Sequence, residues 1–168
     1  MTMLNELEEA NRRYAESFDQ GDRPMPPARH VAVVTCMDAR LHPEKFLGLD
    51  IGDAHVIRNA GGRVSDDAIR SLVISNQLLG TEEIAVIHHT DCGMLTFSNE
   101  DLRAKLAEGG ADAGDVDFLP FSDNEQSVRD DVDAVRSSPF IPDGIAVKGY
   151  IYDVTTGLLD DVEGAVWR

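Results

Sequence analysis

Short apolar runs alternate with helix-like segments along most of the chain. Three of these runs predict buried strands: "HVAVVT" at 30–35, "AHVIRN" at 54–59 and "EIAVIHH" at 83–89. The tail "IAVKGYIYDVTTGLLDDV" reads as two more strands joined by Thr-Thr-Gly, which is typical of a β-hairpin. This order of strands and helices predicts an α/β fold with a mainly parallel central sheet, flanking helices and a C-terminal hairpin.

The segment between the second and third strands predicts a helix over 66–79. Ser65 is the expected N-cap, acids fill the first turn, and Gly80 is the expected stop. A helix that is apolar on nearly all sides needs cover on two faces, so we expect the sheet on one side and a second subunit on the other. The apolar residues that cover most of its circumference are Ile69, Leu72, Val73, Ile74, Leu78 and Leu79.

Two later helices are predicted by capping boxes, in which a Ser side chain and an acidic or amide side chain three residues on satisfy backbone N–H groups. One box pairs Ser98 with Asp101. The other pairs Ser122 with Glu125 and starts a helix that runs to the break at Pro139.

The N-terminal stretch, about residues 3–19, is charged and amphipathic and predicts one more helix. It lacks the apolar core of a signal peptide, and no run of the chain reaches the roughly 18 apolar residues of a membrane span. No linker or repeat divides the 168 residues. We therefore expect a single domain, 1–168, located in the cytoplasm.

Charge and cysteine content narrow the function further. The formal net charge of -16 would repel nucleic acid and anionic membranes, which excludes both as partners. Disulfides are rare in the cytosol, so the two cysteines are expected to be reduced, as ligands or catalysts. Cys36 alone would be interpreted as a small buried hydrophobic residue.

The two cysteines stand at the ends of two predicted strands. Cys36 closes the first strand in "VVTCMDAR", and Cys92 follows the third in "VIHHTDCG". Sites in such sheets form outside the carboxyl ends of strands, and two thiolates with an imidazole suit zinc. We choose His89 as the third ligand because His88 alternates to the opposite face, where it would pack under the sheet or bond to a neighbouring carbonyl.

Asp38 and Arg40 follow Cys36 at spacings that give Asp38 two alternative roles. Three protein ligands leave one position of a tetrahedral zinc open, and Asp38 could close it as a fourth ligand. Alternatively, Arg40 could hold the carboxylate of Asp38 in a two-pronged ion pair. A carboxylate held that way stays ionised and can orient water at the metal.

"CMDAR" followed by "HTDCG" resembles the β-class carbonic anhydrases, whose pattern is Cys-x-Asp-x-Arg and then His-x-x-Cys. "HVIRNAGGRVSDDAIRSL" and "LGTEEIAVIHHTDCGM" resemble the small prokaryotic branch, and the similarity is dense from about residue 29 to 97. The resemblance implies a zinc enzyme, with one Zn²⁺ per chain, that hydrates CO2 to bicarbonate as a homodimer or a dimer-based tetramer. It also implies the site residues: Cys36, His89 and Cys92 as ligands, Asp38 and Arg40 as the catalytic dyad, and the segment 58–62 as cleft lining.

The small residues Ala60, Gly61 and Gly62 would leave room for CO2, which needs only an apolar pocket beside the metal. Glycines there could instead serve only a tight turn. A full reaction cycle must also export a proton, and no spacing selects a carrier among the candidates His42, His55 and His88.

Three rival functions share part of this pattern. A cysteine phosphatase loop needs an arginine six residues after the thiol, where this chain has His42. A zinc hydrolase of CS2 or COS would share all five ligand and dyad residues. A non-enzymatic zinc-stabilised or thiol-regulatory protein would instead have Asp38 closing the zinc site permanently.

Overall fold

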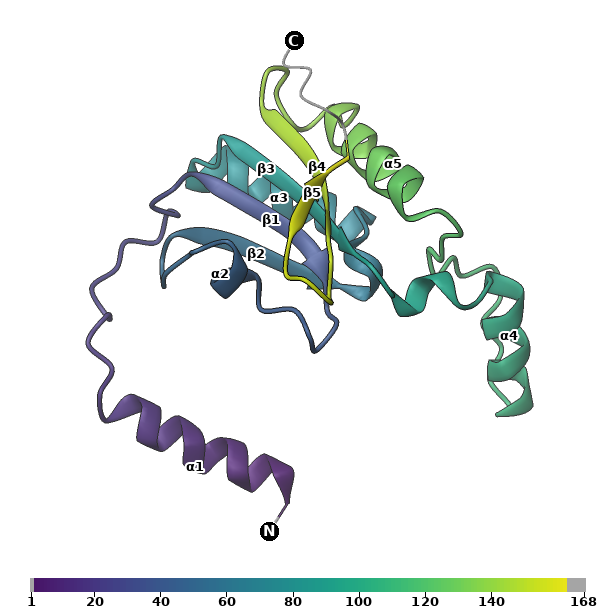
Figure 1. Cartoon of the computed structure of the whole chain (residues 1–168), viewed down its shortest axis with the longest axis horizontal. Helices are drawn as coiled ribbons and strands as arrows, with labels where there is room; N and C mark the ends of the chain where they lie inside the picture. Colours follow the sequence, from purple (N-terminus) through teal and green to yellow (C-terminus); the bar gives the residue numbers. More distant parts are fainter. Residues whose placement is uncertain (1, 163–168) are drawn as a thin grey trace.

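The computed structural model describes residues 2–162, and a five-stranded sheet of order β2-β1-β3-β4-β5 forms its centre (Figure 1). β1 to β4 pair in parallel, and β5 runs antiparallel to β4. This confirms the predicted α/β fold with a C-terminal hairpin. The strands are β1 (Val31–Cys36), β2 (Ala54–Asn59), β3 (Glu83–His89), β4 (Ala146–Tyr152) and β5 (Leu159–Asp161).

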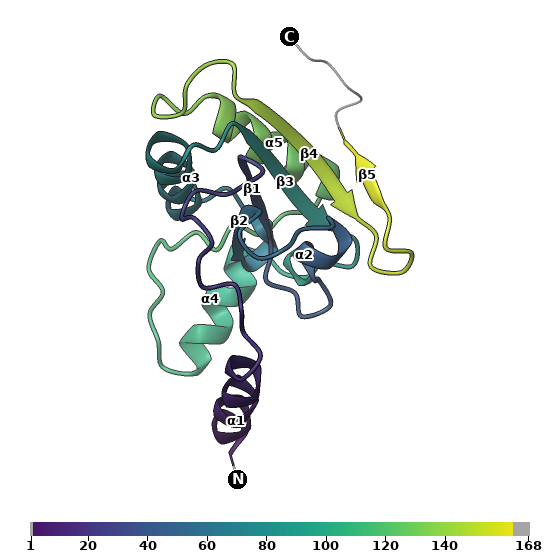
Figure 2. The same cartoon turned by 90° about the vertical axis from the view of Figure 1, so that its left-hand side faces the viewer.

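The helices connect and cover the strands. α3 lies on one side of the sheet and the short α2 on the other, while α5 packs against β3 and β4 (Figure 2). The helices are α1 (Met3–Ala15), α2 (Pro43–Phe46), α3 (Asp66–Leu79), α4 (Asn99–Glu108) and α5 (Asn124–Arg136), with 3-10 turns η1 (Ala60–Gly62) and η2 (Gly93–Leu95).

The main core lies between the sheet and the two helices α3 and α5. Alternate residues of each buried strand point into it, as the pleat requires. Burial of these aliphatic side chains fixes the strand registers, because a slip of one residue would turn them to the other face. The core comprises Ala32, Val34, Ala68, Leu72, Ile84, Val86, Val128, Val132, Val135, Ile141 and Val147.

Local capping explains where the helices begin. The Ser65 side chain accepts from the Ala68 N–H, and Gly80 ends α3 in the left-handed conformation. The capping box of Ser98 is formed as predicted. The second box is a correction: Asp123, not Ser122, caps α5, because its carboxylate accepts from the backbone N–H of Gln126 at 3.0 Å.

The N-terminal helix differs from its prediction in length. α1 ends at Ala15 rather than near residue 19, and it buries no side chain. Figure 1 shows it standing away from the sheet on an extended segment. α3 likewise leaves Ile74 and Leu78 exposed on its outer face. Among residues 2–162, no helix is long and apolar enough to cross a membrane.

A substitution at Gly149, in β4, tests how closely α5 packs on this strand. A Cβ at this position would collide with Val128 and would lie 3.0 Å from Cγ2 of Val132. Gly149→Ala should therefore lower the free energy of unfolding by about 1–3 kcal/mol, the usual cost of overpacking a core. Urea denaturation of both proteins measures this change. Gly21→Ala is the matched control, because its Cβ would meet only Phe18 at 3.9 Å; equal stability of the two variants would contradict the packing described here.

Candidate metal centre

Cys36, His89 and Cys92 converge at the carboxyl edge of the sheet. Cys36 ends β1, His89 ends the neighbouring parallel strand β3, and Cys92 follows at the start of η2. All three are buried, and their ligand atoms lie within 4.8 Å of one another. Both cysteines are free thiols. The three candidate ligands predicted from the sequence thus form one cluster of two sulfurs and one nitrogen.

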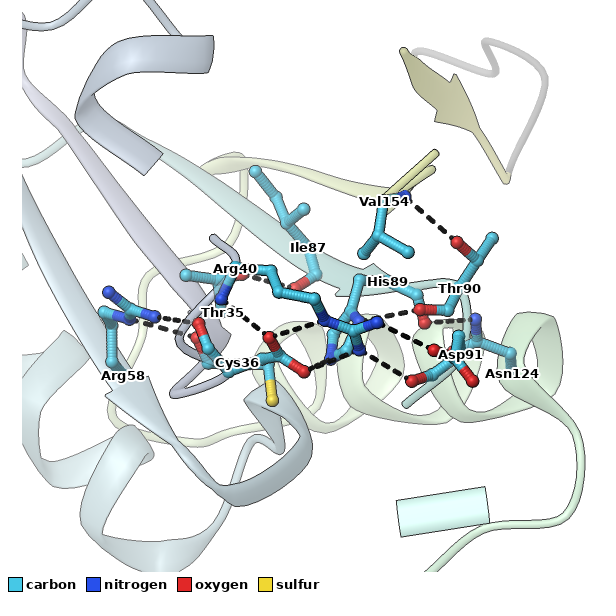
Figure 3. Close-up of polar contacts among 11 residues, drawn as sticks. Thr35, Cys36, Arg40, Arg58, Ile87, His89, Thr90, Asp91, Asn124 and Val154 are labelled. Carbon is cyan, nitrogen blue, oxygen red and sulfur yellow. Dashed lines mark hydrogen bonds and ion pairs between the residues drawn. The ribbon is translucent and has the colours of Figure 1, made fainter. Parts of the chain in front are cut away.

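The His89 imidazole is oriented as a metal ligand would be. Its Nδ1 lies 2.8 Å from the carbonyl oxygen of Thr90, which fixes the proton on that nitrogen (Figure 3). Its Nε2 is buried and has no hydrogen-bond partner among the described residues. A buried acceptor without a partner is costly, and a metal ion beside the two sulfurs would satisfy it. The residues therefore fit a zinc ion.

The pKa values of the two thiols are shifted in opposite directions. The hydrogen bond from the Cys92 thiol lowers the pKa of Cys36 to about 4, although burial opposes this shift. The same hydrogen bond, together with burial, raises the pKa of Cys92. Thiolates are the metal-binding form, so Cys36 is prepared for a metal and Cys92 would lose its proton when one binds.

Arg40 holds Asp38 beside this cluster. The guanidinium donates to both carboxylate oxygens, from Nε at 3.0 Å and from Nη2 at 2.8 Å, and the backbone N–H of Arg40 adds a third bond at 2.8 Å. These hydrogen bonds keep the pKa of Asp38 far below its ordinary value, so the carboxylate is ionised at neutral pH. Its Oδ2 lies 3.8 Å from Nε2 of His89, which is too long for a hydrogen bond.

Two further charged residues, Arg58 and Asp91, support the loop that carries Asp38; the sequence placed Arg58 in the cleft-lining segment 58–62 but indicated no individual role for either residue. Arg58 of β2 donates to the carbonyl oxygens of Cys36 at 3.0 Å and Asp38 at 2.7 Å. Asp91 accepts from Arg40 at 2.7 Å. Arg58 lies within the "RNAGG" segment, and Asp91 lies within "HTDCG". Only the contacts across strands reveal what either side chain binds.

The glycines of η1 have conformations and neighbours that exclude other residues. Gly61 and Gly62 have φ values of +79° and +69°, a region that favours glycine. A Cβ on Gly62 would lie 2.9 Å from the backbone nitrogen of Cys36, and one on Gly61 would lie 2.9 Å from Cγ of Met94. The turn therefore packs directly on the candidate ligand Cys36. Ala60, in contrast, is exposed.

His88 occupies the opposite side of β3, where it is fully buried. Its Nε2 lies 3.0 Å from the carboxylate of Asp131 on α5, not from a backbone carbonyl as one reading of the sequence allowed. Arg63 forms a two-pronged ion pair with the same carboxylate at 2.9 and 3.1 Å. The ring of Phe121 stacks on His88 and lies under Arg63. This buried network joins the end of η1 to α5 and β3.

An apolar cluster surrounds the two cysteines. Phe46 and Tyr152 stack with ring centroids 4.2 Å apart, and Phe121 also packs against this cluster. The cluster comprises Cys36, Leu41, Cys92 and Met94, with Phe46, Phe97, Phe121, Tyr152 and Val154 packed against it.

Comparison with known proteins decides which family this arrangement belongs to. The family described as carbonic anhydrase matches residues 31–117. Beta-carbonic anhydrase 1 of Mycobacterium tuberculosis is 43% identical over 162 residues, which cover 96% of this chain and 99% of that protein. The chain belongs to the β-carbonic anhydrase family.

Solved structures extend the β-carbonic anhydrase match to the fold. The crystal structure of a carbonic anhydrase from Streptococcus mutans superposes with a TM-score of 0.93 at 51% identity, covering 97% of this chain and 99% of that one. A carbon disulfide hydrolase of Acidithiobacillus thiooxidans is also related, at 34% identity over 95% of this chain and 90% of its own length. The resemblance drawn from the sequence motifs is thereby confirmed.

The histidines considered as proton carriers have different environments in this β-carbonic anhydrase. His88 is fully buried, and its Nε2 lies 3.0 Å from the carboxylate of Asp131. Nδ1 of His55 lies 2.7 Å from the hydroxyl of Ser75. His42 is exposed at the start of α2. Of the three, His42 is exposed, His55 is half-buried and His88 is fully buried.

Zinc content tests the cluster directly. The purified protein should hold about one zinc per chain, because three ligands converge and His89 Nε2 is otherwise unpaired. Cys36→Ser should lower both the zinc content and the midpoint of thermal unfolding, since metal binding is coupled to folding. Metal analysis and calorimetry measure the two effects. Less than about half an equivalent of zinc in the parent protein after supplementation would contradict the assignment.

Proposed function

We propose that this β-carbonic anhydrase catalyses the zinc-dependent, reversible hydration of CO2 to bicarbonate and a proton. One observation carries the proposal: a buried Cys36–His89–Cys92 cluster lies beside an Asp38 carboxylate that is turned toward Arg40. Cys36, His89 and Cys92 would hold the ion. Zinc held by three protein ligands lowers the pKa of bound water from 15.7 to about 7, which supplies a nucleophile at neutral pH.

Asp38 would orient the attacking water. The carboxylate is ionised and acts only as an acceptor, so it can fix where the water proton points. Because Arg40 occupies both carboxylate oxygens, Asp38 is kept from joining the ligands. This position favours an enzyme over a protein whose zinc is only structural, since the structural role would need Asp38 as a fourth ligand.

The apolar cluster and the glycine turn would form the CO2 pocket. CO2 has no charge and no hydrogen-bond donor, so binding requires space and apolar walls more than polar contacts. We assign Ala60, Gly61 and Gly62 to its lining. Gly61 and Gly62 are buried against Met94 and Cys36, and Ala60 would stand at the rim.

Carbon disulfide hydrolysis is the second candidate. The relative from Acidithiobacillus thiooxidans favours it, although its 34% identity is lower than the 43% of the mycobacterial carbonic anhydrase. Stopped-flow CO2 hydration and sulfide release from CS2, measured on the same zinc-loaded preparation, separate the two activities. We expect rapid CO2 hydration; CS2 turnover without CO2 hydration would reverse the assignment.

Arg40→Ala tests the division of roles at the site. Without Arg40, the pKa of Asp38 returns toward its ordinary value, which still leaves it ionised at pH 7, so protonation cannot explain a loss of activity. The freed carboxylate should instead join the ligands. We expect unchanged zinc content and a loss of CO2 hydration of roughly 10²-fold or more, the scale of a general-base contribution.

Two further variants complete this test. Asp38→Ala should keep its zinc and lose activity to a similar extent, because the water is then not oriented. Arg40→Lys should retain more activity than Arg40→Ala, since one ammonium can still bind one carboxylate oxygen. Wild-type turnover by Arg40→Ala between pH 6.5 and 9 would refute the proposed role of the dyad.

We also propose that the enzyme assembles as a homodimer or a dimer-based tetramer. α1 has apolar side chains but buries none of them within its own chain: Met3, Leu4 and Leu7 are all exposed. β2 stands at an edge of the sheet, and its outer side has no strand partner among residues 2–162. A second copy could cover both features. We place the enzyme in the cytoplasm, where its two ligand thiols stay reduced.

Light scattering tests the assembly. The parent chain should have at least twice the monomer mass of 18.4 kDa at micromolar concentration. A double substitution, Leu4→Glu with Leu7→Glu, should shift the mass toward the monomer because it places charge on the apolar stripe of α1. Glu8→Gln with Glu9→Gln, on exposed positions of the same helix, is the control. A parent protein that is monomeric would disprove the proposal.

A further inference from the structure

We propose that Asp91 is a positioning residue for the reaction: it anchors Arg40 to the end of β3, and Arg40 in turn keeps Asp38 away from the ligand cluster. This inference rests on the proposed function. It adds a second carboxylate to the dyad of Asp38 and Arg40. It also explains how a side chain on the loop after β1 is held in place relative to ligands at the end of β3 and just after it.

Arg40 donates two hydrogen bonds to Asp91, one to its carboxylate and one to its backbone carbonyl. Nη1 of Arg40 donates to Oδ2 of Asp91 at 2.7 Å, and Nη2 donates to the backbone carbonyl oxygen of Asp91 at 2.9 Å. Figure 3 shows the guanidinium of Arg40 extended toward Asp91, next to His89. Arg40 is thus the only described residue that donates hydrogen bonds to both Asp38 and Asp91.

The backbone conformation of Asp91 lets its carboxylate and its carbonyl oxygen both accept from Arg40. Its φ is +54°, in the left-handed region that most residues avoid and that Asp and Asn tolerate best after Gly. It stands between His89 and Cys92, in the short turn that separates these two ligands. The unusual conformation therefore coincides with the point where carbonyl and carboxylate both accept from Arg40.

The two carboxylates do not compete for the same hydrogens. Asp38 accepts from Nε and Nη2, whereas the Asp91 carboxylate accepts from Nη1. The planar guanidinium has five N–H donors in a fixed arrangement, so anchoring one side fixes the direction of the other. Without Asp91, Arg40 and Asp38 would remain paired but could move together as part of one loop, with His89 Nε2 only 3.8 Å from Asp38.

The solvent exposure of Asp91 and Arg40 distinguishes a positioning role from a structural one. The side chain of Asp91 is 80% exposed and that of Arg40 is 46% exposed. Ion pairs at such positions contribute little to folding stability. A variant at Asp91 should therefore leave the fold and the zinc content nearly unchanged and yet alter the geometry at the metal, a combination that a structural ion pair would not produce.

The experiment compares Asp91→Ala with the parent in the full zinc-loaded chain. We expect kcat for CO2 hydration to fall about tenfold, as is usual when a group that orients the site is removed. Zinc stoichiometry and the thermal midpoint should stay close to the parent values. The visible spectrum of the cobalt(II)-substituted protein reports the ligand set independently of activity. That spectrum should shift in Asp91→Ala toward the spectrum of Arg40→Ala, in which Asp38 is free to bind the metal.

Three variants serve as controls. Asp91→Asn keeps the left-handed backbone and an acceptor oxygen, and it should recover most of the activity. Asp91→Gly relieves the backbone but has no side-chain acceptor, and it should resemble Asp91→Ala. Asp67→Ala removes another exposed Asp–Arg pair, bonded to Arg70 at 2.7 Å and remote in sequence from the ligands; it should retain parent activity and the parent cobalt spectrum.

A double-mutant cycle decides whether Asp91 acts through Arg40. In an Arg40→Ala background, Asp91→Ala should change neither the residual activity nor the cobalt spectrum. A further loss there, full activity in Asp91→Gly, or a parent-like kcat and cobalt spectrum in Asp91→Ala would each overturn the proposal. If the parent enzyme fails to hydrate CO2, the proposed function fails, while the cobalt spectra still test the positioning role.

Discussion

The parallel pairing of β1 with β3 is the constraint on which the site depends. The register aligns Thr35 with Ile87, and the hydroxyl of Thr35 adds a hydrogen bond of 2.8 Å to the Ile87 carbonyl oxygen. Cys36 and His89 therefore lie at the same edge of the sheet, although 52 residues separate them in the sequence. The chain leaves β1 toward β2 and returns to β3 on the other side, which is the switch point where α/β sheets form their sites.

The sequence was sufficient for features encoded by neighbouring residues. The apolar runs located β2 and β3 to the residue, and the cap at Ser65 and stop at Gly80 located α3. The cysteine and histidine spacing selected a set of candidate ligands that the fold brings together. In each case a short stretch carries the whole signal, so no knowledge of the fold was needed.

The sequence does not predict contacts between segments that are distant along the chain. Asp131 on α5 binds both His88 and Arg63, and nothing near residue 131 in the sequence indicates either partner. Asp91 is in a recognisable motif, but its partner Arg40 is 51 residues away. The cap at Asp123 failed for a different reason. Ser122 and Asp123 are both good capping residues, and the backbone conformation, not the residue type, decides between adjacent candidates.

The Arg–Asp pairs near the site differ in their access to solvent, and this has a consequence for how the enzyme responds to its ionic environment. In the Arg63–Asp131 pair the side chains are 15% and 4% exposed, so dissolved ions cannot approach it. Arg40 faces water, and at about 0.15 M salt the screening length is roughly 8 Å. Dissolved ions can therefore weaken the proposed dyad of Asp38 and Arg40 more than they weaken the buried pair beneath it. In a protein with a net charge of -16, counter-cations gather around the surface, and the exposed Arg40 is open to them whereas the buried Arg63–Asp131 pair is not.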